Sequence, residues 1–343
     1  MPEEEVVVVG AGVAGLACAR ELARAGLRPM VLEKARGVGG RCATRRVEGQ
    51  PVDHGVLFLH GADLEFAAEV EAVDSPRIPG WPQRVDGTGS PCQPEAFADR
   101  QRRWAFQAGI TAFPKHLARG LDVRLNTPVR EIRPDRKVLV IRTGAGEAVR
   151  CRTIILALAL EQTAALAEGM GPTRADLAGV VRMLRMMSTV PCLTMLAGYP
   201  RETPAPLWDV SYPEDSPVLQ LVSHDSAKRA ERRFHCLVYQ GRPRWSREHL
   251  EEPPKAWGAE ILREAGRRLG PWAARPGWMQ VHRWRYARLE AGNELAGPVL
   301  CDLDGGVRLG LAGELFSPGG GVEAAWASGR RLARRILEKG EAG

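Results

Sequence analysis

The sequence lacks any cysteine pattern that would build a disulfide framework or a metal site. Its seven cysteines are scattered and odd in number, and no two of them form a Cys-x-x-Cys pair. Zinc sites and redox-active disulfides need closely spaced pairs, so we expect no metal ion. Reduced, structural cysteines are typical of intracellular proteins, which predicts a cytoplasmic location.

Long hydrophobic runs and nucleic-acid-binding motifs are absent as well. No apolar run approaches the roughly 20 residues that a membrane helix needs, and the acidic start, residues 1–5, has no signal-peptide character. The formal net charge is +7, but the basic residues are dispersed along the chain. We therefore expect neither a membrane nor a nucleic acid as partner. An alternative role for the positive charge is to steer an anionic, phosphate-bearing substrate.

The N-terminal segment carries a dinucleotide-binding fingerprint. Four valines, residues 6–9, lead directly into Gly10, Gly12 and Gly15. The first glycine permits a tight turn, the second lets the backbone approach a pyrophosphate, and the third lets the next helix pack closely on the strand. The N-terminus of that helix offers unpaired N–H groups to the phosphates. The residues expected to contact the cofactor here are Gly10, Gly12, Val13, Ala14 and Gly15.

An acidic residue follows the fingerprint at the spacing that a ribose-binding carboxylate requires. We expect the first helix to end at Gly26 and a second strand to span residues 30–32, with Glu33 at its end. A carboxylate there binds the adenosine ribose and argues against a 2′-phosphate, so NAD or FAD is favoured over NADP. Lys34, next in the chain, is a further candidate for cofactor binding.

A second glycine cluster distinguishes between NAD and FAD. Residues 37–41, Gly-Val-Gly-Gly-Arg, follow Glu33 almost at once, and Arg41 can neutralise a phosphate with its fork of donors. With these motifs the sequence resembles the FAD-containing amine-oxidase-like flavoproteins, in which fingerprint, acid and Gly-Gly-Arg form one long signature. The resemblance implies FAD as the cofactor, with Gly39, Gly40 and Arg41 among the residues that bind it.

The C-terminal region resembles the same family. Residues 307–314 read as a strand ending in Gly313-Glu314, and glycines 319–321 open a final helix. In the family the Gly-acid pair holds the ribityl chain and the helix N-terminus faces the flavin, where charge develops on reduction. The family usually has Asp where this chain has Glu314. Besides this pair, the resemblance implicates Gly321, Val322, Ala325 and, against the adenine, Val129.

The order of elements predicts an α/β protein with two discontinuous domains. We expect a Rossmann-like FAD-binding domain of glutathione-reductase type from residues 1–61, 109–165 and 298–343. Residues 62–108 and 166–297 are expected to form a substrate domain, an antiparallel sheet with helices. Within these domains we expect a short helix at 109–120, a hairpin at 138–141 and 148–155, a buried strand at 154–160, helices at 162–169, 173–187 and 255–269, strands at 218–223 and 234–239, and an irregular segment at 74–94.

Several passages narrow the resemblance to renalase and its bacterial relatives. Residues 35–46, the run Asp53-His54-Gly55 and residues 281–287 (Val-His-Arg-Trp-Arg-Tyr-Ala) carry it. The resemblance implies oxidation of misplaced-hydride isomers of NAD(P)H by hydride transfer to flavin N5, with O2 as electron acceptor and H2O2 as product. It also places Asp53, His54 and Gly55 at the cofactor.

The substrate pocket has candidates but no assigned catalytic residue. Hydride transfer of this kind depends on positioning and exclusion of water rather than on a base. The candidates are His54, Phe58, Trp284 and Tyr286. The last two alternate on one expected strand and share a face, either as an aromatic wall or as core, whereas His282 is expected to be structural.

One departure from the renalase pattern leaves other functions open. After Gly55 the family commonly continues Ala-Gln-Tyr-Phe, but residues 56–59 are Val-Leu-Phe-Leu. If these residues line the pocket, it lacks a partner for the amide of nicotinamide. The alternatives are a flavin amine oxidase or desaturase with an apolar substrate, and a flavin-binding sensor or scaffold without turnover.

Overall fold

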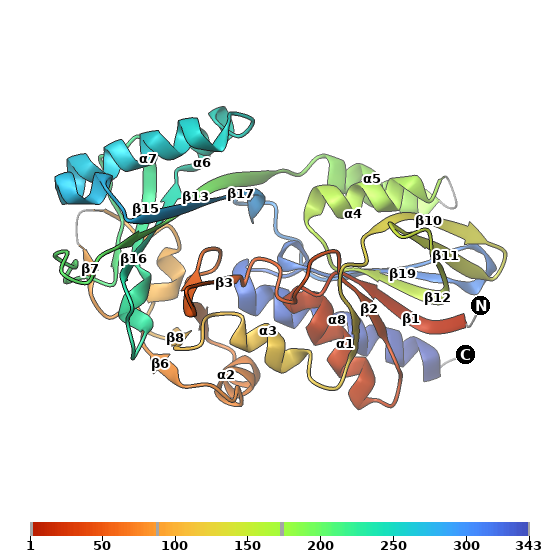
Figure 1. Ribbon diagram of the computed structural model, residues 1–343. Coiled ribbons are helices and arrows are strands. Elements are labelled where there is room, and N and C mark those ends of the chain that lie inside the picture. The colour runs from red at the N-terminus through yellow and green to blue at the C-terminus, as the bar shows by residue number, and fades with distance from the viewer. Residues whose placement is uncertain (1–2, 87–88, 172–174, 342–343) are drawn as a thin grey trace. The chain divides into compact units, whose positions relative to one another are not determined.

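The chain forms two compact units in a computed structural model that describes residues 3–86, 89–171 and 175–341 (Figure 1). Unit 1 consists of Met1–Gly40, Phe113–Thr189 and Leu289–Gly343. Unit 2 consists of Arg41–Ala112 and Val190–Arg288. Each unit has its own sheet and its own hydrophobic core.

Unit 1 is built on a sheet whose central part is parallel. β1 (Glu3–Val9) pairs in parallel with β2 (Met30–Leu32) on one side and with β12 (Ala148–Leu156) on the other. β9 (Asp122–Arg124) and β19 (Arg308–Leu311) extend this part, giving the order β9-β2-β1-β12-β19. That order is typical of dinucleotide-binding sheets and confirms the predicted Rossmann-like fold.

Antiparallel strands complete this sheet. β10 (Val129–Asp135) and β11 (Val138–Thr143) form a hairpin, and β11 continues onto the first half of β12, as expected from the sequence. β18 (Val299–Asp302) pairs antiparallel with β19. The central valines of β1 are at most 3% exposed, because both faces of the sheet are covered.

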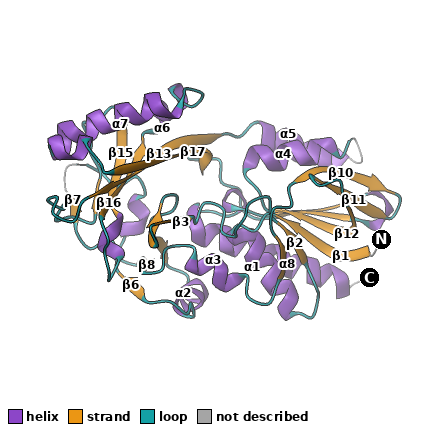
Figure 2. Cartoon of the chain, viewed as in Figure 1, coloured by secondary structure: helices purple, strands orange, loops and turns teal. Residues whose placement is uncertain are grey.

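Helices α1 (Val13–Arg24) and α8 (Gly321–Glu341) lie side by side on one face of this sheet (Figure 2). A Cβ atom at Gly329 of α8 would lie 2.1 Å from the carbonyl oxygen of Ala14, so the two helices touch through their backbones. α4 (Leu160–Gly169) and α5 (Ala175–Arg185) pack against each other and contribute side chains to the hydrophobic core of unit 1. α3 (Ala112–Leu117) begins at the boundary between the units.

The first helix ends where the sequence predicts. Gly26 has a φ of 91°, and its N–H donates to the carbonyl of Ala23 while the N–H of Leu27 donates to that of Leu22. This pair of bonds is the Schellman arrangement, which satisfies the last carbonyls of a helix through a left-handed glycine. The helix end at Gly26 is therefore confirmed.

Unit 2 is built on a mostly antiparallel sheet in the order β17-β13-β16-β15-β14-β7, with only β14 and β7 parallel among its paired strands in the described residues. Its strands are β17 (Trp278–Leu289), β13 (Thr189–Tyr199), β16 (His235–Gly241), β15 (Leu219–His224), β14 (Val210–Ser211) and β7 (Val85–Asp86). α7 (Pro254–Leu269) packs Trp257, Ile261 and Ala265 on one face of this sheet. It starts at the Pro253-Pro254 pair, which confirms the predicted helix start.

Smaller elements of unit 2 come from residues 41–112. They are a hairpin of β3 (Thr44–Val47) and β4 (Gln50–Asp53), a three-stranded sheet of β5 (Leu59–Gly61), β8 (Arg102–Phe106) and β6 (Arg77–Pro79), and α2 (Leu64–Glu71). The short helix α6 (Pro243–Glu248) follows β16. A second core cluster joins Val52 and Leu57 of this region to Leu196 and Val238 of the large sheet.

The units divide the chain differently from the expected domains. Residues 41–61 belong to unit 2, because the β3–β4 hairpin is bonded to residues 225–229. Residues 166–189 and 289–297 belong to unit 1, because α4 and α5 bury their apolar faces in its core. The expected boundaries at residues 1–2 and 342–343 lie outside the described residues.

Several elements differ from their predicted extents. The buried strand ends at Leu156, and α4 starts at Leu160. The short helix spans only residues 112–117, and the segment at 74–94 contains β6 and β7. Position 173, where the predicted helix 173–187 begins, and residues 87–88 lie outside the described residues. None of the described helices is both long and apolar enough to cross a membrane.

The close approach of Gly15 to Gly10 leads to a prediction about stability. A Cβ at Gly15 would lie 2.1 Å from the carbonyl oxygen of Gly10, so Gly15→Ala forces α1 away from β1. We expect the free energy of unfolding to fall by about 1–3 kcal/mol or more, as for other overpacked sites. Gly179→Ala, in α5 with no atom within 4 Å of the new Cβ, is the matched control and should be neutral or slightly stabilising. Equal denaturant midpoints for the two variants would contradict this packing argument.

Candidate functional site

The fingerprint loop of unit 1 is shaped by close backbone contacts. Gly10 has a φ of 106°, and its N–H donates to the carbonyl of Leu32 at 2.8 Å. A side chain there would meet the carbonyl of Ala157 at 2.5 Å. The loop is thereby held over the carboxyl ends of β1 and β2, where open α/β sheets bind their ligands.

Open space lies above the second fingerprint glycine. A Cβ at Gly12 would meet no atom within 4 Å, unlike one at Gly10 or Gly15. Gly12 is also the N-cap of α1, which has no side-chain cap and no acidic residue in its first turn. The N–H groups of that turn are therefore available to an anion, as a bound pyrophosphate requires.

Glu33 organises the loop around this position. Its side chain is 7% exposed, and its two oxygens accept hydrogen bonds of 2.8 Å from the N–H groups of Ala11 and Ala35. Each carboxylate oxygen has two acceptor sites, so a ribose hydroxyl can still be bound. Lys34, in contrast, has an exposed side chain.

The second glycine cluster lies against the first. The N–H of Gly39 donates to the carbonyl of Ala11 at 2.8 Å, and Gly39 forms a parallel bridge with Gly12. A Cβ at Gly40 would have only the Cα of Gly12 within 4 Å, at 3.6 Å. The two glycine clusters thus present one continuous stretch of bare backbone, a cradle that fits the diphosphate of FAD.

The C-terminal motif lies in the same unit. The N–H of Gly313 donates to the Ser328 hydroxyl, and the carboxylate of Glu314 accepts from the N–H of Leu289. Glycines 319–321 all have positive φ and lead into α8, where Val322 and Ala325 lie in the first turns. Val129 begins β10 at a half-buried position. The roles of these residues in holding the ribityl chain, the flavin and the adenine remain predictions.

The carboxylate of Asp53 lies in a buried ion-pair network of unit 2. Its Oδ2 is 2.5 Å from Lys228 Nζ and 3.0 Å from Arg229 Nη2, and both cations also pair with Asp225. Burial alone would raise the pKa of Asp53, but these two cations outweigh it and hold that pKa well below the usual carboxyl range. Asp53 was expected to bind the cofactor, but its side chain is fully buried and saturated by protein partners, including the Thr44 hydroxyl and the Ile110 N–H.

His54 forms a cluster of rings with two residues of β17. Its ring stacks on Trp284 at 5.4 Å between centroids and lies 5.0 Å from the ring of His282, and the Trp284 indole N–H donates to the carbonyl of His54 at 3.0 Å. Burial, assisted by His282 and Arg45, lowers the pKa of His54 to about 3, and burial likewise lowers the pKa of His282. Both imidazoles are therefore neutral at physiological pH, and Nδ1 of His54 has no hydrogen-bond partner.

The backbone beside His54 is tightly packed. A Cβ at Gly55 would lie 2.1 Å from the Arg41 carbonyl and 3.0 Å from the Trp284 ring. The carbonyl of Gly55 accepts from the Gln240 side chain, and Arg41 donates to the carbonyl of Ala287 at 3.3 Å. His54, Gly55, Arg41 and β17 are thus brought together, although the cofactor roles of the first three stay predictions.

Phe58 was expected in the pocket, but it lies in the hydrophobic core. It is 4% exposed and makes edge contacts with Trp81 and Phe97. Leu57 is buried in the same core, and its carbonyl accepts from Lys228. Residues 57–59 of the apolar run are therefore buried in the interior, whereas Val56 is half-buried. Tyr286 is half-buried on β17, and His282, expected to be structural, belongs to the ring cluster.

Comparisons with known proteins decide the family. Residues 8–69 match the NAD(P)-binding Rossmann-like domain, and residues 89–337 match the flavin containing amine oxidoreductase family. The chain belongs to this family. Family membership confirms FAD as the cofactor and confirms the expectation of a flavin-dependent oxidoreductase at the level of the family.

Curated relatives match over short segments only. The chain is 46% identical over 86 residues to the putative flavin-containing monoamine oxidase AofH of Mycobacterium tuberculosis, covering 24% of the chain and 18% of that protein. It is 43% identical over 63 residues to a probable polyamine oxidase of Arabidopsis thaliana, covering 18% of the chain and 13% of that protein. The chain thus spans less than a fifth of the length of these relatives.

Solved structures share the fold along almost the whole chain. Putrescine oxidase bound to putrescine superposes with a TM-score of 0.72 at 16% identity, covering 98% of this chain and 99% of that one. A putative protoporphyrinogen oxidase from Exiguobacterium superposes with a TM-score of 0.75 at 14% identity, over 98% and 100% of the two chains. At these identities the likeness concerns the fold alone.

The open space above Gly12 generates a binding prediction. The Cβ of Gly12→Val would have no protein atom within 4 Å, and the side chain would occupy the approach of the diphosphate. We expect a folded protein whose FAD affinity, measured by flavin fluorescence quenching, falls at least about tenfold. Gly297→Val, a loop glycine of the same unit with equally open surroundings, should bind FAD as the wild type does. Undiminished FAD affinity in Gly12→Val would contradict the proposed cradle.

The buried ion-pair network generates a second prediction. Asp53→Asn leaves Lys228 and Arg229 undercompensated and should cost about 3–5 kcal/mol of unfolding free energy at pH 7. Because the folded-state pKa of Asp53 lies below its unfolded value of about 3.9, its contribution is present above that value and is lost as the pH falls further.

Denaturant unfolding between pH 3 and pH 7 tests both the loss of unfolding free energy and its pH dependence. The variant should lose less stability on acidification than the wild type does. Asp215→Asn, which removes an exposed partner of Arg268, is the control and should change little. A stable Asp53→Asn protein with the wild-type pH dependence would show that the network contributes nothing.

Proposed function

We propose that the protein is an FAD-dependent oxidase of renalase type, which oxidises dihydronicotinamide isomers of NAD(P)H and uses O2 as electron acceptor. FAD, when bound, accepts a hydride at N5 and passes the electrons to O2, giving H2O2. The protein's task is then to bind a planar donor, to orient it and to exclude water.

The observation that carries this proposal is the uncharged ring cluster of His54, His282 and Trp284. Its two imidazoles are neutral, and no carboxylate is bonded to it in the described part of the chain. The nearest acid in sequence, Asp53, is committed to Lys228 and Arg229. A planar, uncharged dihydropyridine ring can stack on such a surface, and its release of hydride needs no proton acceptor.

The local field also favours an anionic donor. Arg45 adds positive charge near both histidines, and the chain as a whole carries a formal charge of +7. Phosphate-bearing dinucleotides are attracted by such a field, whereas protonated amines are repelled by it. The finer assignment within the family thus rests on electrostatics together with the sequence resemblance to renalase.

A second candidate is oxidation of an amine. The family and its similar proteins, which are named as monoamine, polyamine and putrescine oxidases, favour it. An amine must lose a proton before it can release hydride, and Nδ1 of His54 is a buried ring nitrogen without a partner. A flavin-binding sensor without turnover is the third candidate.

Anaerobic stopped-flow absorbance distinguishes these candidates. On mixing the flavin-loaded protein with 2- and 6-dihydro isomers of NADH, we expect rapid bleaching of the oxidised-flavin band, reversed by air. Putrescine or cyclohexylamine at equal concentration should leave the band unchanged. Bleaching by amines alone would support the second candidate, an amine oxidase. Bleaching by neither donor would support the third, a flavin-binding sensor without turnover.

The pH dependence provides a separate readout. Because the pKa of His54 is about 3, its imidazole stays neutral throughout the range from pH 5 to pH 8. The rate of flavin reduction by dihydronicotinamide should therefore be flat across this range. A rate that rises about tenfold per pH unit would indicate a substrate that must first lose a proton, as an amine does.

A further inference from the structure

We propose that unit 2 contains a binding site for a single anionic group, a carboxylate or a phosphate, formed by Arg288, Tyr212 and Arg242 around a small cavity. The site lies on strands β14 to β17 and on the segment that follows β7. None of these three residues belongs to the ring cluster of His54, His282 and Trp284.

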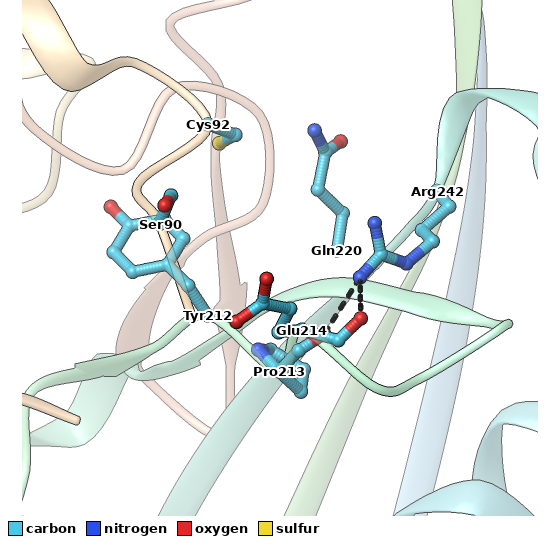
Figure 3. Close-up of a pocket in the computed structure, with 7 residues that line it drawn as sticks. All are labelled: Ser90, Cys92, Tyr212, Pro213, Glu214, Gln220 and Arg242. Carbon is cyan, nitrogen blue, oxygen red and sulfur yellow. Dashed lines mark hydrogen bonds between the residues drawn. The ribbon is translucent and has the colours of Figure 1, made fainter. Parts of the chain in front are cut away.

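The cavity has a volume of about 220 Å³ and lies within unit 2. Figure 3 shows Ser90 and Tyr212 on one side of it, Gln220 and Arg242 on the other, and Cys92 above. Ser90 is exposed, so the cavity is open to solvent at that point. The volume accommodates one phosphate or carboxylate group with its nearest carbon atoms, but not a whole dinucleotide.

Arg288 supplies the first positive charge. Its Nη2 donates to the Gln220 side-chain oxygen at 2.9 Å, and its guanidinium also contacts the sulfur atoms of Cys92 and Cys192. Two of these partners, Gln220 and Cys92, line the cavity. No carboxylate pairs with Arg288 in the described part of the chain, although arginine removed from water normally has such a partner.

The neighbouring thiol does not compensate this charge. Burial raises the pKa of Cys92, even though Arg288 opposes that shift. The thiol is therefore neutral at physiological pH and can act only as a weak hydrogen-bond partner. Arg288 keeps a positive charge that no described residue neutralises.

Tyr212 supplies a donor that has no partner within the protein. Its side chain is 1% exposed, and its hydroxyl makes no hydrogen bond in the described structure. Burial raises the pKa of this phenol, so it remains protonated and able to donate. A buried hydroxyl without a hydrogen-bond partner costs free energy. A bound hydrogen-bond acceptor would remove this cost.

Arg242 adds a second guanidinium at the cavity wall. Its Nη2 donates to the carbonyls of Pro213 and Glu214 at 2.8 and 2.7 Å (Figure 3). Its Nε donates to the carbonyl of Ser216. Nη1 has no bond within the described residues, which leaves two N–H donors. The Glu214 carboxylate also lines the cavity, but its side chain is exposed at the rim, where water screens its charge.

These groups match the chemistry of an oxyanion. Arginine binds carboxylate and phosphate through parallel N–H donors, and bonds to charged acceptors are stronger than neutral ones. One guanidinium group and one neutral phenol line the cavity, and a second guanidinium group is bonded to Gln220 in its wall. A negatively charged group bound there would complement all three.

Isothermal titration calorimetry of the flavin-loaded protein with inorganic phosphate, and separately with propionate, tests the site. We compare the wild type with Arg288→Gln and Tyr212→Phe. The second variant removes a hydroxyl that has no protein partner, so folding should not suffer. The control is Arg283→Gln, on β17 as well, whose Nη2 donates to the carbonyl of Glu252.

We expect saturable binding of at least one anion at one site per chain. Arg288→Gln should weaken it about tenfold or more, and Tyr212→Phe about two- to tenfold, while Arg283→Gln stays within twofold of the wild type. Absence of saturable binding, or equal affinities in all four proteins, would overturn the proposal. Melting temperatures without added anion confirm that each variant is folded.

A competition experiment identifies the source of the anion. This experiment is the only one here that rests on the proposed function. Competitive inhibition by phosphate against a dihydronicotinamide mononucleotide would support the site as one for the substrate's own anionic group. Non-competitive inhibition would support it as a site for a free anion. Anion binding without any turnover would reject the proposed function and leave the site in place.

Discussion

The carboxylate of Glu33 is the interaction on which the nucleotide-binding half of unit 1 depends. Its oxygens hold the N–H groups of Ala11 and Ala35, and its own backbone bonds to Arg124 and Thr127. One residue thereby connects the fingerprint loop, the second glycine cluster and the segment after β9. The same charge that orients these loops would repel a 2′-phosphate. Selection of the dinucleotide and assembly of its loops are thus two consequences of one buried carboxylate.

Unit 2 relies on a different use of buried charge. Asp53 and Asp225 are each paired with both Lys228 and Arg229, so two negative and two positive charges neutralise one another away from water. Such a network is a weak source of net stability, because desolvation offsets much of the attraction. Its directional bonds nevertheless determine where the β3–β4 hairpin lies, and Asp53 is followed directly by His54. The network therefore positions the backbone that leads into the ring cluster.

The sequence allowed accurate prediction where the determinants are local. The end of α1 at Gly26 depends on residues within one turn, and the fingerprint and Glu33 belong to one strand–helix–strand segment, so their spacing revealed them. The burial of the Asp53 and Phe58 side chains was not foreseen, because their partners lie far away along the chain, at Lys228 and Trp81. A motif places a residue near a site, but the direction of its side chain depends on distant packing. Likewise, nothing local marks Tyr212 or Arg288 as neighbours of one cavity, since they come from segments far apart along the chain.

The balance of buried charge in unit 2 bears on the kind of ligand that this unit can bind. The buried acids Asp53 and Asp225 are already matched by as many buried cations. A protonated amine entering this unit would find neutral imidazoles at the ring cluster and no unpaired buried carboxylate among the described residues. Arg288 presents the opposite imbalance, a half-buried positive charge without an anion among the described residues. Because an uncompensated charge removed from water is costly, an anion bound at the proposed site would complete the balance that the described residues leave open.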